Sequence, residues 1–160
     1  MSNLIPAGAG IGWSAELNSL ARDVAAEVLE TMFYSTAVAG DCNASSEELI
    51  RGASLEFHGA HTGTFFAMLT PRVARSLAAA CLGLPEDEIT VEAEWQLTCE
   101  LANVLCGAVL SRWDPNSPVH LTAPKPTTGC PQHLGWRERL ETPEGPLCVG
   151  FSLLGTPWPE

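Results

Sequence analysis

Hydrophobic residues recur every three or four positions in two stretches of the chain, a spacing that predicts amphipathic helices. The first stretch begins at Ser14, a residue suited to cap a helix, and continues to about Phe33. The second follows Thr70, another capping residue, and runs from Pro71 to Gly83. Each helix is expected to bury one face, so the chain needs another layer of structure to cover it.

Shorter stretches of alternating or β-branched and aromatic residues predict strands. These stretches are residues 51–58, 64–69, 119–123, 136–142 and 147–154. Turn-forming residues at 59–63 and 143–146 join four of them into two antiparallel hairpins, and residues 36–48 form a polar connection. Because a helix followed by strands occurs twice, we predict an α+β pseudo-repeat of helix-strand-strand units, with long helices packed on an antiparallel sheet.

Residues 94–113, EWQLTCELANVLCGAVLSRW, predict a helix that is apolar around most of its circumference. One narrow lane of small and polar residues spans an arc of about 80°, at ~100° per residue. The lane contains Gln96, Glu100, Asn103, Gly107 and Ser111. Because the rest of the helix is expected to be buried, this lane is either presented to a partner or is the solvated strip of a core helix. Gly107 either leaves room for an approaching surface or helps the helix to pack.

Composition limits the classes of function. A chain of 160 residues with 46% hydrophobic content suits one domain with a sizeable core. The formal net charge of −11, with Lys125 as the single lysine, argues against nucleic acid and anionic membranes as partners. The amino-terminal residues lack a basic region and an apolar core like those of a signal peptide, and no run approaches the ~18 apolar residues of a membrane span. We therefore expect a cytoplasmic protein.

Cysteine and histidine positions indicate neither a disulfide framework nor a metal site. The six cysteines are widely scattered and are expected to be free thiols. Cys99 and Cys106 are two helical turns apart, ~10 Å along the axis, too far for a disulfide. His58 and His61 have no accompanying ligand motif, so they are expected to be ordinary hairpin histidines. Asp114 is expected to form a turn, and no Ser/His/Asp arrangement or glycine-rich phosphate loop is recognisable.

The sequence ELANVLCG resembles the Glu-x-x-Asn signature of the CheX/CheC/FliY phosphatases. The family pattern is Asp or Ser, three residues, Glu, two residues, Asn, and a proline 23 positions further on. Glu100, Asn103 and Pro126 match this pattern, whereas Gln96 stands in the place of Asp or Ser. The resemblance is closest to the CheX branch, because only one Glu-x-x-Asn occurs. It implies a CheC-like fold, with an amino-terminal arm at 1–13, a CheX-like domain at 14–154 and a tail at 155–160.

The resemblance implies a phosphatase that acts on the aspartyl phosphate of a response regulator. In this role Asn103 orients the attacking water and Glu100 pairs with a cation on the regulator, while Gln96, Gly107 and Ser111 bind the partner. The chain itself is expected to bind no cofactor or metal, because Mg²⁺ is expected on the response regulator. CheX-like proteins are typically homodimers, so a homodimer is expected. The alternative is a non-catalytic module of the same fold that docks a signalling partner through the same helix.

Overall fold

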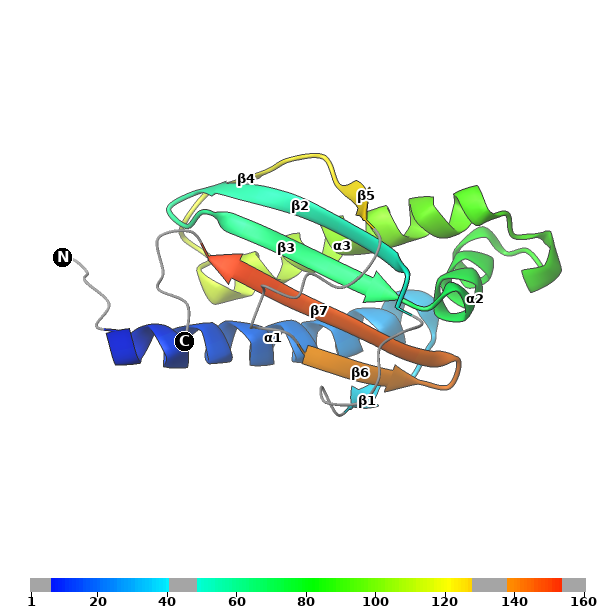
Figure 1. The fold of residues 1–160 in the computed structure, drawn as a ribbon, viewed down its shortest axis with the longest axis horizontal. Coiled ribbons are helices and arrows are strands. Elements are labelled where there is room, and N and C mark those ends of the chain that lie inside the picture. Colours follow the sequence, from blue (N-terminus) through cyan, green and yellow to red (C-terminus); the bar gives the residue numbers. More distant parts are fainter. Residues whose placement is uncertain (1–6, 41–48, 128–137, 154–160) are drawn as a thin grey trace.

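The computed structural model describes residues 7–40, 49–127 and 138–153, with the side chains described from residue 16 onward. In these ranges, helices pack against one antiparallel sheet, which is the predicted α+β class (Figure 1). The helices are α1 (Ala7–Phe33), α2 (Pro71–Leu82) and α3 (Val91–Trp113), with a short 3-10 helix η1 (Glu86–Glu88) between the last two. The strands are β1 (Val38–Ala39), β2 (Arg51–Gly59), β3 (Gly63–Leu69), β4 (Val119–Leu121), β5 (Lys125–Thr127), β6 (Glu138–Thr142) and β7 (Gly145–Leu153).

The sheet joins the two predicted hairpins through their inner strands. Its order is β1-β6-β7-β3-β2-β4, and β5 also pairs with β2. The central pairing of β3 with β7 runs from Gly63 opposite Leu153 to Leu69 opposite Leu147. Two short strands, β1 and β5, were not predicted. The prediction that residues 36–48 form only a polar connection is wrong at 38–39, which form β1. Strands of two or three residues are too short for a visible alternation, and they form because a neighbouring strand pairs with them.

Each long helix covers the hairpin of the opposite half of the chain. Helix α1 packs against β6 and β7, whereas α3 packs against β2 and β3, and the two helices also contact each other on one face of the sheet (Figure 1). The two helix-strand-strand units of the predicted pseudo-repeat are α1-β2-β3 and α3-β6-β7. The long helix of each unit packs on the strands of the other unit. No helix in the described parts of the chain is long and apolar enough to cross a membrane.

The main core lies between the helices and the sheet. Phe57 and Phe65 both pack on Phe151, with ring centroids 5.8 and 4.8 Å apart. A smaller cluster around Phe66 and Met68 is buried separately. Because adjacent strand residues point to opposite faces, β3 is buried on both, which explains its continuous apolar sequence FFAML.

The observed helix boundaries confirm the predicted N-cap of α2 and show that the predicted first residues of α1 and α3 are wrong. Thr70 accepts a hydrogen bond from the N–H of Val73 at 3.1 Å, as predicted. Helix α1 begins at Ala7, so Ser14 is an interior residue and not its N-cap. Helix α3 begins at Val91 and is capped by Thr90, so the predicted start at Glu94 is three residues late. A serine inside a helix costs only ~0.7 kcal/mol or less relative to alanine, so a possible capping residue does not by itself mark where a helix starts.

Candidate functional site

The polar lane of α3 faces outward, as its periodicity predicts. Gln96, Glu100 and Ser111 are exposed, Asn103 and Gly107 are partly exposed, and the opposite side of the helix is buried in the core. The side chains of Glu100 and Asn103 make no hydrogen bond or ion pair within the described residues. Both groups are therefore available to a molecule that approaches α3 from outside.

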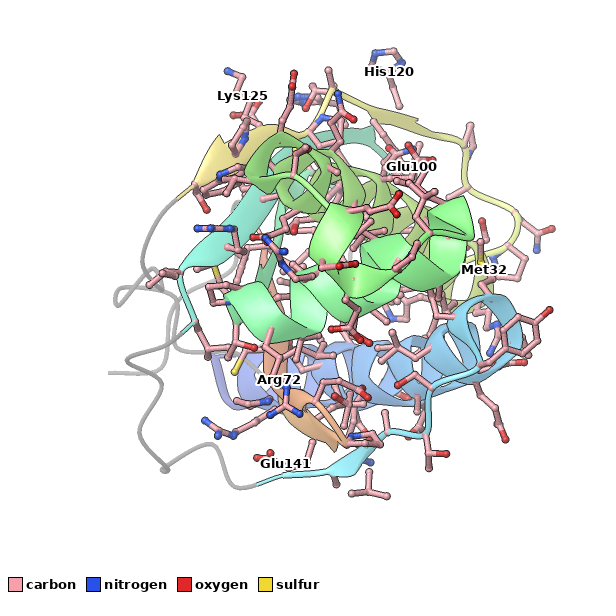
Figure 2. All side chains as sticks on the ribbon, turned by 90° about the vertical axis from the view of Figure 1, so that its right-hand side faces the viewer. Met32, Arg72, Glu100, His120, Lys125 and Glu141 are labelled. Carbon is pink, nitrogen blue, oxygen red and sulfur yellow. The ribbon has the colours of Figure 1, made fainter. Side chains whose placement is uncertain are left out.

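A groove of about 760 Å³ runs beside the amino-terminal half of this lane. Its lining from α3 is Glu92, Trp95, Gln96, Cys99, Glu100 and Asn103, and its lining from the following segment is Leu121, Thr122, Ala123, Pro124 and Pro126. Figure 2 shows Glu100 on the same side of the molecule as Lys125, which lies within that second segment, and His120, which precedes it. Pro126 thus lies in the same groove as Asn103, although 23 positions separate them in the sequence.

Strand β2 holds the second wall opposite α3. Leu121 pairs with Phe57 in the register of β4, and Pro126 pairs with Ala53 in the register of β5. Between them, the N–H of Thr122 donates to the carbonyl of Glu56 at 2.9 Å, and its hydroxyl accepts from the N–H of Glu56 at 2.9 Å. Since α3 packs on the same strand, β2 sets the separation between the two walls.

The predicted partner-binding residues divide between two hollows. Gln96 lies in the groove with Glu100 and Asn103, whereas Gly107 and Ser111 line a second hollow of about 240 Å³. A Cβ atom at Gly107 would lie 3.7 Å from Cδ1 of Leu121, so the chain itself fills part of the space beside the glycine. Periodicity correctly aligned these residues on one lane, but the lane is about 22 Å long at 1.5 Å per residue.

Glu94 forms a buried ionic cluster that the sequence reading missed. Its side chain is only 2% exposed, and its two carboxylate oxygens accept from Arg51 Nε at 2.8 Å and from Arg75 at 2.8 and 2.9 Å. The guanidinium of Arg51 also lies over the Trp95 ring, 5.2 Å from its centroid. Glu94 stands on the apolar side of the helix, and a carboxylate there is a sign of a buried pair.

A second cluster joins the β2–β3 turn to the end of α3. Asp114 Oδ2 lies 2.9 Å from His61 Nε2 and accepts from the Ser117 hydroxyl at 2.7 Å. The His61 ring also packs on Trp113, with centroids 4.3 Å apart. The hydrogen bonds from Ser117 and then His61 lower the pKa of Asp114. The carboxylate separates the serine from the histidine, so this cluster lacks the hydrogen-bond order of a nucleophilic triad.

Four cysteines fall within the described residues, and no disulfide joins any two of them. Cys99 lines the groove beside Glu100, and burial raises the pKa of its thiol. Burial raises the pKa of Cys106 to about 12. Cys42 and Cys130 lie outside the described residues. No group of three or more potential metal ligands occurs in the part of the chain that the structure describes.

Solved structures with the same fold include CheX and CheC-like proteins. A chemotaxis protein CheX from Desulfovibrio desulfuricans superposes with a TM-score of 0.65 at 17% identity, covering 86% of this chain and 99% of that one. For CheX from Vibrio vulnificus the TM-score is 0.69 at 14% identity, with 88% and 97% covered. A CheX–CheY–BeF3–Mg²⁺ complex from Borrelia burgdorferi gives 0.63 at 14% identity, with 84% and 96% covered. These similarities establish a CheC-like fold.

The family follows from sequence. The family described as "Chemotaxis phosphatase CheX" matches residues 51–140, a range that contains Glu100, Asn103 and Pro126. The chain therefore belongs to the CheX family. Among curated proteins, none matches the chain in sequence.

Proposed function

We propose that this protein hydrolyses the aspartyl phosphate of a response-regulator receiver domain, with Asn103 positioning the attacking water. The observation that carries the proposal is the open groove in which Glu100, Asn103 and Pro126 come together. These residues match the signature of the CheX/CheC/FliY phosphatases, and they lie within the CheX-family region. The Borrelia burgdorferi complex of CheX with CheY supports a response regulator as the partner. A cytoplasmic location goes with this proposal.

The reaction asks little of the phosphatase itself. The water oxygen attacks phosphorus, the bond from phosphorus to the aspartyl oxygen breaks, and the products are inorganic phosphate and the restored carboxylate. We expect the response regulator to supply Mg²⁺, so this chain has to place the water in line with the leaving oxygen. The carboxamide of Asn103 can accept from water and donate to it. Being uncharged, it does not repel the phosphoryl oxygens.

Glu100 supplies the second element of the mechanism. Its exposed carboxylate lies one helical turn before Asn103 and has no ion pair within the described residues. A cation on the receiver domain would pair with it, and this charge-assisted contact would fix the docking register of Asn103 against the phosphoryl group.

The experiment follows the decay of a phosphorylated receiver domain with Mg²⁺ in the presence of each variant. Asn103→Ala should lose the acceleration by a factor on the order of 10², because the water loses its orienting partner. Its melting temperature should stay unchanged, since the amide makes no hydrogen bond in the described structure. Asn116→Ala, which removes an exposed amide beyond α3, is the matched control and should keep full activity. Full activity in Asn103→Ala would refute the mechanism.

The alternative is a non-catalytic module that docks the same kind of partner, and the replacement of Asp or Ser by Gln96 favours it. The two hypotheses differ in one measurement. A docking module binds the activated receiver domain without shortening the lifetime of its phosphate, whereas a phosphatase shortens it. Restoring the family residue through Gln96→Asp should raise the rate if Gln96 limits activity.

A further inference from the structure

Trp95 forms part of the groove wall close to the start of α3. Its side chain is partly exposed and faces the groove together with Gln96 and Cys99. A large aromatic side chain on a concave, partly apolar surface is the kind of group that carries binding energy in protein interfaces. The proposed catalytic roles of Glu100 and Asn103 leave this tryptophan without a function.

The guanidinium of Arg51 packs over the indole ring of Trp95. The guanidinium carbon lies 5.2 Å from the ring centroid, and the Arg51 side chain is 16% exposed. Its Nε donates to Glu94 at 2.8 Å. Because Glu94 and Trp95 are adjacent on α3 and Arg51 begins β2, this arginine links the groove wall to the sheet. A guanidinium with its plane fixed by a carboxylate gives the indole a fixed surface on which to rest.

We infer that Trp95 is a docking residue for the partner and that Arg51, which Glu94 holds in place, is a positioning residue that keeps the indole in the groove wall. The inference rests on the proposed function, since the partner is the receiver domain. It also specifies the partner surface: an apolar side chain beside a cation. Leu121, Pro124 and the indole offer apolar contacts, while both charged residues that line the groove, Glu92 and Glu100, are acidic.

The two arginines on Glu94 provide a matched comparison. Arg75 binds the same carboxylate at 2.8 and 2.9 Å and donates to the carbonyl of Glu86 at 3.1 Å. The indole of Trp95 lies against Arg51, from β2, and Arg75 belongs to α2. Arg51→Met and Arg75→Met therefore each remove one cation from a buried pair and should both lower the melting temperature. A cluster that only stabilises the fold would make the two variants equivalent in every other measurement.

The first test separates KM from kcat in the dephosphorylation of a receiver domain, well below the melting temperatures. Trp95→Ala and Arg51→Met should raise KM by about tenfold or more, as expected for a docking aromatic, with kcat changed less than about threefold. Trp95→Phe should recover part of the loss, because a smaller ring still fills the wall. Arg75→Met should leave KM near that of the wild type. An unchanged KM in Trp95→Ala, or equal KM values in the two arginine variants, overturns the inference.

The second test needs no partner. The indole N–H resonance of Trp95, assigned by its loss in Trp95→Phe, should shift or broaden in Arg51→Met and stay in place in Arg75→Met. Equal effects in the two variants overturn the positioning role. A wild-type protein that neither binds nor dephosphorylates any receiver domain overturns the proposed function and the docking role of Trp95. The resonance still decides in that case whether Arg51 positions the indole.

Discussion

Nε2 of His61 lies 2.9 Å from Oδ2 of Asp114, and this contact joins the turn between β2 and β3 to the end of α3. The two residues are far apart in the sequence, so the contact closes a long loop of chain. Ser117 donates to the same oxygen, and both hydrogen bonds favour the charged carboxylate. The stability of the protein therefore depends on the ionisation of Asp114.

The contribution of Asp114 to stability should disappear in acid. Its pKa is lowered in the folded protein from an ordinary value of 3.8, so the unfolded chain binds this proton more readily than the folded chain does. The stabilisation is fully present above pH 3.8 and is lost as pH falls through the lowered pKa. Asp114→Asn should melt at a lower temperature than the wild type at pH 7, and the two melting temperatures should converge toward pH 2. Asp87→Asn, at an exposed site in η1, is the control. A difference that persists at pH 2 would contradict this account.

Gly107 allows the two interpretations of the lane to be separated. Gly107→Ala should raise the melting temperature by roughly 2–4 °C, because alanine is about 1 kcal/mol more favourable within a helix. The added methyl would meet Leu121 at 3.7 Å, an ordinary contact that causes no strain. If a partner uses this space, KM for the phosphorylated receiver should also rise severalfold, and we expect that result. A stabilised variant with unchanged KM would show that no partner uses the space beside Gly107.

The cysteines should be reduced and should differ in reactivity. Alkylation under denaturing conditions without reductant should modify all six, and a stable disulfide would contradict this. Among the described cysteines of the native protein, Cys81 should react first, because it is exposed, and Cys99 more slowly, because burial raises its pKa. Cys106 should be protected, since it is buried and its pKa is about 12.

Alkylation of Cys99 should also slow dephosphorylation, because the added group fills part of the groove. The activity of Cys99→Ser should not change on treatment with the same reagent.

We expect a homodimer in solution. The prediction comes from the single-motif resemblance to CheX and from the sheet edges, which have no further strand paired to them among the described residues. In the edge strand β1 the side chain of Val38 is 58% exposed, and that of Tyr34, shortly before the strand, is 88% exposed. Light scattering across a concentration series should give twice the chain mass, and a monomeric mass at tens of micromolar would contradict the prediction.

The sequence predicted features that arise within one element or across one turn. Thr70 caps α2 through a residue three positions further on, and Gly83 ends that helix in the left-handed conformation, at φ 69°. The lane of α3 was visible because helical periodicity alone sets the direction of each side chain around the axis. Local contacts of this kind are encoded by neighbouring residues, so pattern and capping chemistry are sufficient to read them.

Features that depend on distant segments were decided by the tertiary structure. Glu94 carries no local sign of its two arginines, which come from β2 and α2. Helix α1 covers the β6–β7 hairpin and α3 covers the β2–β3 hairpin. The hydrophobic periodicity of a helix cannot predict which hairpin that helix will cover. The lane could be predicted from Gln96 to Ser111, but the wall opposite it exists only because β4 and β5 pair with β2. Periodicity sets where a side chain points, whereas packing decides what it meets, and so the groove around Asn103 required the folded chain.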